Sequence, residues 1–432
     1  MSSIPITYHA EWWVPAKADL SQKELSMIPE GMEKKYAGNL TYDGKNDTTL
    51  ELYILPSRHS ATHFSHNDVM WGEDTNGNKF TLFNVEMLKG SYGQFSKTEY
   101  KVGLILLGEH VLSLNDTRYS QCVVKYPYLK HWAFDDRLNR DLFSKDISLT
   151  LTEQDRNRTL ISSTVSKGVE WKLNYNFDLY WNDFDATIKQ DTYLLIKTSE
   201  DISIHNYLHQ ILEFSQFLSI ALFCEQSPNE ISLVSKESGK KTKVLFTLSS
   251  SKDPRSKQLI KYYELSDKIP VMLKKWHEQY ERVSPIAGYL IKSLNNKSTF
   301  DVPDFLILAQ SLDGYHKRFV NKKDGKDVRQ YEHQMTVLLK KFKSVKAVSD
   351  CHIDPEILKD SRHKYSHLYP DEEPTKAVGI DDLYWLTEKC KVLLTCCILN
   401  MIGLTNEEIN LCCEDSPLRD IVDLLPPELN NK

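Results

Sequence analysis

The stretch DDLYWLTEKCKVLLTCCILNMIG, residues 381–403, decides the fold class of the C-terminal part of the chain. Its apolar side chains recur every three or four residues, at Leu383, Leu386, Cys390, Leu393, Cys397 and Met401. This spacing places them on one stripe of an α-helix. Gly403 directly after the stripe is a typical C-terminal stop. The pattern therefore predicts a long helix that is buried along one side.

Two stretches upstream have the same helical period. DFLILAQSLDGYHKRF, residues 304–319, and DVRQYEHQMTVLLKKF, residues 327–342, both carry apolar stripes at helical spacing. The polar stretch SSSKDPRSK, residues 249–257, reads as a linker or long loop before them. The sequence thus predicts an all-α helical bundle over residues 256–432.

Residues 1–255 instead show the two-residue period of strands that are buried on one face. Asp43-Gly44 and Asn76-Gly77 are typical of two-residue hairpin turns. One amphipathic helix is expected at 204–223. The clearest strand patterns are TLELYIL (49–55), DISLTLT (146–152), NEISLVS (229–235) and TKVLFTLS (242–249). We therefore expect an α+β multidomain protein whose N-terminal domain is β-rich and sandwich-like or barrel-like.

The composition is that of a soluble globular protein, with 41% hydrophobic and 26% charged residues in a chain of 432. No apolar run approaches the ~20 residues of a membrane helix, and the N-terminus has no secretory signal pattern. We expect a cytoplasmic location and no membrane partner. The 8 cysteines include no C-x-x-C motif and are expected to be reduced, buried thiols.

The formal net charge of -6 argues against a chain that is coated with basic residues for nucleic acid. The segment 317–346 is nevertheless strongly basic, and it is open to two interpretations. It is either the solvated face of a helix pair or a surface that neutralises RNA phosphates. The residues that would bind RNA in the second case are Arg318, Lys322, Lys323, Lys340, Lys341 and Lys343.

An arginine and a histidine separated by four residues occur together in RHKYSH, as Arg362 and His367. The same spacing occurs in RHSATH, as Arg58 and His63, so the spacing alone does not identify a site. RHSATH follows a predicted strand in the β-rich half, where we expect a structural role. The surroundings of RHKYSH are different.

Asp354-Pro355-Glu356 is a strong helix start, because it supplies an N-cap, a proline in the first turn and an acid near the positive helix end. Five residues of an α-helix subtend 500°, or 140° beyond a full turn. Arg362 and His367 would therefore not share a face. They can converge only if the helix ends near His367, which Tyr369-Pro370 favours, or if a second chain completes the site.

The RHKYSH motif, with a polar residue after its arginine at the end of a short bundle helix, resembles that of a HEPN-domain ribonuclease. The wider chain is similar to the ApeA family of bacterial abortive-infection proteins, which join a β-rich domain to a HEPN domain. In LILAQSLDGYHKRF, Asp313 stands where such proteins usually carry glutamate. The N-terminal resemblance lies in WWVP (12–15), YAGNLTYDGKNDTTLELYIL (36–55), GNKFTLFNVEM (77–87) and YPYLKHW (126–132).

The resemblance implies an endoribonuclease that acts in phage defence and is completed by a homodimer or a higher homo-oligomer. His367 would be a general acid or base and Arg362 a clamp on the phosphate. His363 and Tyr365 would position the RNA, and Asp313 would orient Arg362. This chemistry requires no metal and no cofactor. The N-terminal domain would sense a phage-derived trigger.

The alternative is a non-catalytic HEPN module that binds nucleotides, nucleic acid or protein, beside a β domain that recognises a ligand. His205 and His209 have zinc-ligand spacing, but no HExxH glutamate accompanies them. The tryptophans at 12, 13, 71 and 132 are open to two interpretations, a ligand platform or an aromatic core. No phosphate-binding glycine loop and no G-x-S-x-G motif is present.

Overall fold

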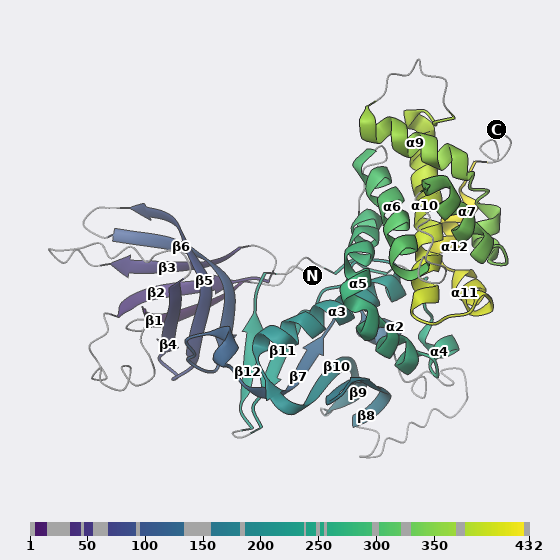
Figure 1. The fold of residues 1–432 in the computed structure, drawn as a ribbon. Helices are drawn as coiled ribbons and strands as arrows, with labels where there is room; N and C mark the ends of the chain where they lie inside the picture. The colour runs from purple at the N-terminus through teal and green to yellow at the C-terminus, as the bar shows by residue number, and fades with distance from the viewer. Residues whose placement is uncertain are drawn as a thin grey trace. The chain divides into compact units, whose positions relative to one another are not determined.

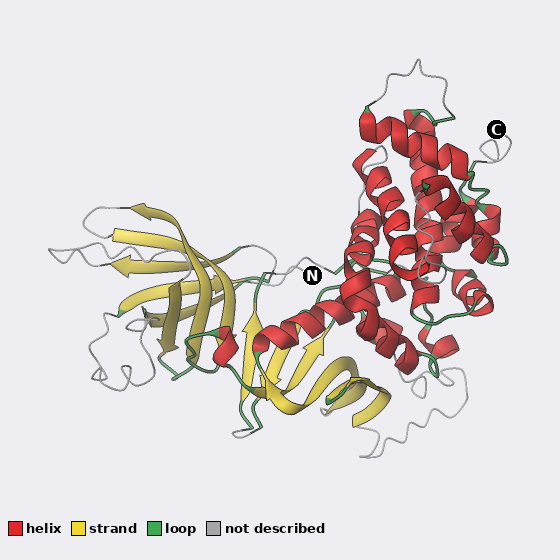
Figure 2. Ribbon diagram, in the orientation of Figure 1, coloured by secondary structure: helices red, strands yellow, loops and turns green. Residues whose placement is uncertain are grey.

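A computed structural model describes residues 5–14, 35–44, 47–54, 68–91, 96–133, 157–181, 186–236, 239–247, 251–254, 257–295, 302–320, 330–368 and 376–426. Strands dominate the first half of the chain and helices the second (Figure 2). Contacts divide the chain into two compact units, each made of segments that are separate in the sequence; Figure 1 colours the chain by residue number. The first unit contains Met1–Pro127, Thr192–Ile211 and Ser227–Ser250, and the second contains Tyr128–Asp191, Leu212–Gln226 and Ser251–Lys432.

The first unit contains a closed antiparallel barrel. Its strands are hydrogen-bonded in the order β3-β2-β1-β4-β5-β6, and β3 pairs again with β6. Closure leaves no open sheet edge among these strands. The strands are β1 (Ile6–Trp13), β2 (Tyr36–Tyr42), β3 (Thr48–Ile54), β4 (Asp68–Asp74), β5 (Lys79–Ser91) and β6 (Ser96–Leu107).

The barrel interior is filled by aromatic and aliphatic side chains. Trp12, Phe80 and Met70 are fully buried there, and the rings of Trp12 and Phe80 lie 5.5 Å apart. Gly72 makes room for the indole, because a Cβ atom at this position would lie 2.3 Å from Trp12. The turn expected at Asn76-Gly77 is present but is longer than the two residues predicted: the Asp74 amide donates to the Asn78 carbonyl, and of the two residues only Gly77 has a positive φ, 76°. The Asp74 carboxylate accepts hydrogen bonds from the backbone amides of Asn76 and Asn78.

The sheet of the first unit continues from β6 through β12 (Lys241–Leu245), β11 (Glu230–Val234), β7 (Tyr119–Lys125) and the second half of β10 (Ala186–Ile202). The short 3-10 helix η1 (Leu114–Asp116) precedes β7. Helix α3 (Ile204–Leu222) follows β10 and confirms the helix expected at 204–223. Its first residue, Ile204, is fully buried.

The second unit combines a strand pair with a helical bundle. β8 (Asn157–Ser166) pairs with β9 (Val169–Trp181), and Ser163 of β8 donates a hydrogen bond to the Pro270 carbonyl at the start of α5. The helices are α2 (Leu129–Trp132), α4 (Tyr262–Leu265), α5 (Ile269–Asn295), α6 (Val302–Tyr315), α7 (Tyr331–Lys341), α8 (Lys346–Asp350), α9 (Pro355–His367), α10 (Ile380–Met401), α11 (Asn406–Cys413) and α12 (Pro417–Asp423).

Helix α10 is the centre of the bundle. It packs against α5, α6, α8, α11 and α12, and Leu393 and Cys397 on its apolar stripe are fully buried. Gly403 beyond its end has a φ of 107°, as the predicted stop requires. All the cysteines lie among the described residues and are present as thiols. Burial in this apolar interior raises the pKa of the Cys390 and Cys397 thiols.

The predicted α+β class is confirmed, with a barrel-containing β region before a helical region. The helix predicted over 304–319 was wrong at its end, because His316–Val320 form a π-helical turn, η4. The expected strand at 146–152 lies outside the described residues, and the domain boundary near residue 255 stays a prediction. Among the described residues, no helix has both the length and the apolar character that crossing a membrane requires.

Candidate functional site

Helix α9 begins and ends where its sequence predicts. The Asp354 carboxylate caps the helix, since its Oδ1 accepts hydrogen bonds from the amides of Glu356 at 2.8 Å and Ile357 at 3.4 Å. The helix ends at His367, because Leu368 takes the left-handed conformation with a φ of 57°. Arg362 therefore lies in the body of α9, and His367 is its last residue.

The Arg362 side chain is placed by residues of two other helices. Its guanidinium carbon lies 4.6 Å from the ring centroid of Tyr331, the first residue of α7. Its Nη2 atom lies 4.0 Å from Oδ2 of Asp313 on α6. The same oxygen accepts a hydrogen bond from Lys317 Nζ at 2.9 Å. With 34% of its side chain exposed, Arg362 is anchored and still accessible from solvent.

The histidines lie on a different side of α9. The rings of His363 and His367 are 4.6 Å apart and nearly perpendicular, and both residues are exposed. Because α9 stays helical through His367, the 140° separation from Arg362 holds in this chain. Asp313 thus lies near Arg362, and His363 lies near His367. The two histidines occupy a different face of α9 from Arg362.

Tyr365 is turned towards the segment that precedes α10. Its hydroxyl donates a hydrogen bond to the Val378 carbonyl at 3.0 Å, and its ring packs edge-on against Phe305 of α6. The buried Ser361 hydroxyl accepts a hydrogen bond from the Val378 amide at 3.1 Å. These contacts hold residue 378 against α9, and the expected role of Tyr365 in positioning RNA stays a prediction.

The predicted RNA-binding residues that the structure describes fall into two groups. Lys340, Lys341 and Lys343 are exposed at and beyond the end of α7, whereas Lys322 and Lys323 lie outside the described residues. Arg318 in η4 is exposed, but it is tied to α5: its Nη1 donates to the Arg282 carbonyl at 2.6 Å. Arg282 in turn donates to the Arg318 carbonyl.

Sequence reasoning missed two residues near this site. Tyr331 falls on a helical stripe that predicts only a core residue, and no local pattern indicates that its ring meets Arg362. His316 is 2% exposed, and its Nδ1 has no hydrogen-bond partner in the described part of the chain. Burial lowers the pKa of His316, which favours the neutral imidazole.

The remaining sequence candidates have other surroundings. Arg58 and His63 lie outside the described residues. His205 and His209 are both exposed on α3. Over the described ranges, no group of three or more histidine, cysteine, aspartate or glutamate side chains is arranged to hold a metal ion.

The tryptophans do not form a single platform. Trp12 and Trp132 are fully buried, and the Trp132 indole donates a hydrogen bond to the Ile260 carbonyl at 2.7 Å. Trp71 stacks on His110 with ring centroids 4.9 Å apart, and the edge of Trp13 meets the same histidine. The aromatic-core interpretation therefore holds for Trp12 and Trp132.

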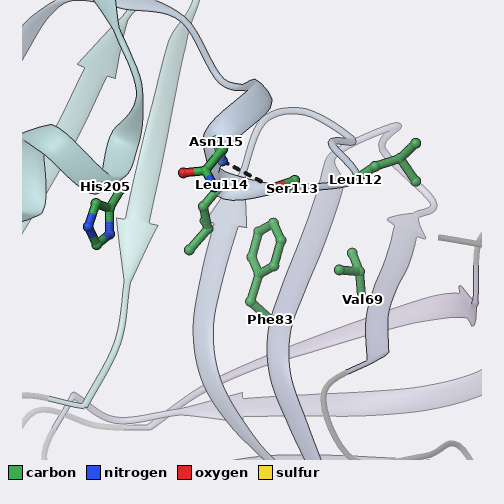
Figure 3. A pocket seen from close by; sticks show the side chains of 7 residues that line it. All are labelled: Val69, Phe83, Leu112, Ser113, Leu114, Asn115 and His205. Carbon is green, nitrogen blue, oxygen red and sulfur yellow. Dashed lines mark hydrogen bonds between the residues drawn. The ribbon is translucent and has the colours of Figure 1, made fainter. Parts of the chain in front are cut away.

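A pocket of about 380 Å³ lies in the first unit (Figure 3). Its size is within the range of small-ligand sites. Figure 3 shows Phe83 of β5 and Leu114 of η1 beside Ser113, whose hydroxyl accepts a hydrogen bond from the Asn115 amide. The remaining lining residues are Val69, Leu112, Asn115 and His205. The lining is mainly apolar, with polar groups among it.

The barrel and the helical bundle match two family models. Residues 306–408, which include Asp313, Tyr331 and α9, match the ApeA-like HEPN domain, so the helical region contains a HEPN domain. Residues 7–276 match ApeA N-terminal domain 1. The chain belongs to the ApeA family, a family of abortive-infection proteins with a HEPN nuclease domain. No curated protein and no solved structure matches the chain.

Proposed function

We propose that this protein is an endoribonuclease that cleaves RNA through Arg362 and His367 without a metal ion. The observation that carries the proposal is the placement of Arg362. A permanent cation is anchored but exposed on a helix that ends in an exposed histidine, within a domain of a generally ribonucleolytic family. An arginine with only a packing role has no need of that accessibility.

The proposed reaction uses the nucleophile that RNA carries. A base removes the proton of the 2′-hydroxyl, the oxygen attacks the adjacent phosphorus, and the 5′-oxygen leaves with a proton from an acid. The products are a 2′,3′-cyclic phosphate and a 5′-hydroxyl. His367 serves as acid or base, because imidazole titrates near neutrality. Arg362 binds the phosphate oxygens as negative charge develops on them.

We propose that a second copy of the chain completes the site. The reaction needs both an acid and a base, and Arg362 and His367 of one chain lie on different faces of α9. A twofold pair would present two copies of each residue to one phosphate. Lys340, Lys341 and Lys343 would then hold the flanking RNA backbone through its phosphates.

The cellular role that fits is phage defence by cutting RNA, for example structured loops such as tRNA anticodons. The first unit would hold the nuclease inactive until a trigger arrives, and the pocket lined by Phe83 and Leu114 would accept an apolar segment of a phage protein.

Leu112→Trp should fill the pocket and abolish phage-triggered growth arrest, while RNA cutting in vitro continues. Leu88→Trp, at an exposed position of β5 that does not line the pocket, is the matched control. Equal growth arrest in both variants would show that the pocket does not bind the phage-derived trigger.

The test of catalysis is RNA cleavage by Arg362→Ala and His367→Ala in the presence of EDTA. Each variant should lose about 10²–10⁴-fold in rate, the usual contribution of general acid–base or phosphate-binding groups. Circular dichroism should show that the fold is retained. Arg58→Ala and His63→Ala, which have the same spacing, should cut like wild type. Cleavage that persists in both α9 variants would leave the non-catalytic HEPN module as the remaining interpretation.

A further inference from the structure

The Asp313 carboxylate is a poor candidate for the group that orients Arg362. The distance of 4.0 Å between Arg362 Nη2 and Asp313 Oδ2 exceeds the 2.7–2.9 Å of a charged hydrogen bond. The same oxygen is 2.9 Å from Lys317 Nζ, one helical turn further along α6. Asp313 therefore pairs more closely with Lys317 than with Arg362, and it fixes the arginine only weakly.

The Tyr331 side chain is held by burial and by a hydrogen bond at its far end. Its side chain is buried, with 8% of the residue exposed, and its hydroxyl donates a hydrogen bond to the Ala309 carbonyl at 3.1 Å. Both the ring and its distal hydroxyl are thus fixed between α6 and α7. Burial also raises the pKa of this tyrosine well above its usual value, so the ring remains a neutral phenol at physiological pH.

The geometry of the arginine–tyrosine contact matters for function. A cation over an aromatic face is attracted when it lies within about 6 Å of the ring centroid, and here the distance is 4.6 Å. A guanidinium that stacks on a ring uses its face for the contact, whereas the N–H donors that bind phosphate lie in its plane. A carboxylate pair would occupy those donors and offset the positive charge. An aromatic ring can therefore hold the guanidinium while leaving its phosphate-binding edge available.

From these contacts we infer that Tyr331, rather than Asp313, is the positioning residue for Arg362. The inference rests on the proposed ribonuclease function, because it assigns Arg362 the task of binding the reacting phosphate. The tyrosine ring sets the plane of the guanidinium before RNA arrives. Asp313 and Lys317 form a neighbouring ion pair that shapes the local charge.

The kinetic test compares three variants of the full chain. Tyr331→Phe keeps the ring and should retain kcat within about threefold. Tyr331→Leu removes the ring and should lower kcat about 10-fold or more, with a smaller change in KM. Asp313→Asn should lower kcat less than Tyr331→Leu does. A larger loss in the asparagine variant, or equal losses in the phenylalanine and leucine variants, would overturn the inference.

Tyr280→Leu is the matched control for the loss of a buried tyrosine, since Tyr280 on α5 is 4% exposed. This variant should lose stability and still cut RNA at the wild-type rate per folded molecule. If Tyr331→Leu does not fold, Tyr331→Met replaces it as the variant without a ring. Thermal melts of all the variants separate a loss of fold from a loss of positioning.

A spectroscopic readout separates this inference from the proposed function. In chains labelled at arginine with ¹⁵N and ¹³C, the ring current of Tyr331 should shift the Arg362 side-chain signals upfield. The shift should survive in Tyr331→Phe and disappear in Tyr331→Leu. If wild type cuts no RNA and the shift still disappears, the ribonuclease proposal fails and the positioning stands. A shift that is unchanged in Tyr331→Leu refutes the positioning whatever the activity.

Discussion

The two ends of the RHKYSH segment are held in different ways. Arg362 lies against the ring of Tyr331 from another helix of the same unit, with Asp313 as a more distant neighbour at 4.0 Å. His367 is the exposed last residue of α9, and its ring meets His363 from the preceding turn of the same helix. An arginine that must bind phosphate can be pre-positioned within one chain. Under the proposed ribonuclease function, the histidine would acquire its catalytic geometry only when RNA or a second chain is present.

The largest expected effect is a recovery of RNA cleavage when two inactive variants are mixed. Arg362→Ala and His367→Ala chains should each be nearly inactive alone, about 10²–10⁴-fold below wild type. If the site forms between two copies, a mixture of the two should recover cutting well above either variant. The measurement is cleavage of a labelled RNA after subunit exchange. A mixture that stays as inactive as its components would show that one arginine and one histidine from different chains do not suffice for cleavage.

The lysines at the end of α7 should separate binding from chemistry. Replacing Lys340, Lys341 and Lys343 together by glutamine should weaken RNA binding and reduce the slope of log affinity against log salt by about 2. Fluorescence anisotropy at several salt concentrations measures that slope. Lys241→Gln with Lys243→Gln on β12, where both lysines are also exposed, provides a control with an unchanged slope. An unchanged slope in the triple variant would assign these lysines to a solvated helix end.

The buried His316 should make the stability of the bundle depend on pH. Because burial lowers its folded-state pKa, the unfolded chain binds a proton that the folded chain does not, at pH values below about 6.5. The stabilising contribution is present above pH 6.5 and is lost as pH falls through the folded pKa, with a slope of at most about 1.4 kcal/mol per pH unit. Urea unfolding at pH 7.5 and 5.5 should show a smaller difference in His316→Gln than in wild type. Equal differences would exclude His316 as the cause.

The smallest expected effect concerns the end of α9. Leu368 is 85% exposed and has a φ of 57°, a conformation that glycine adopts without the penalty of a Cβ atom. Leu368→Gly should therefore raise the free energy of unfolding by about 0.5–1 kcal/mol. Chemical denaturation measures the change, and Leu411→Gly within α11 should instead be destabilising. A loss of stability in Leu368→Gly would show that the leucine packs against something in solution.

Local signals explain how much could be predicted from the sequence. The start of α9 follows from Asp354 and Pro355, and the position of a hairpin turn, though not its length, follows from Asn76-Gly77, because each acts on its own backbone. The periodicity of α10 predicts its burial for the same reason. These features need no knowledge of how distant parts of the chain pack.

Asp313 is expected near Arg362 from the family resemblance, but Tyr331 could not be predicted as its neighbour, because that contact depends on how separate helices pack together. Tyr331 has the spacing of a core residue, and its burial agrees with that, but its contact with the guanidinium arises only when α7 packs against α9. The π-helical turn after α6 could not be predicted from the sequence either, because apolar spacing alone predicts a continuous α-helix through Phe319. Barrel closure likewise depends on the pairing of β3 with β6, which no local pattern encodes.

Arg282 of α5 and Arg318 of η4 each donate a hydrogen bond to the other's backbone carbonyl, which couples the movement of these two elements. Helix α5 begins within the part of the chain that matches the N-terminal family domain and continues past it to Arg282. Its only internal proline, Pro285, comes after that residue. Pro285 has no N–H for the carbonyl of Glu281, so the regular hydrogen bonding of α5 is interrupted at the turn that contains Arg282. If the first turns of α5 tilt, Arg282 would move with them. Its two hydrogen bonds with Arg318 would then shift the π-helical turn that follows Asp313.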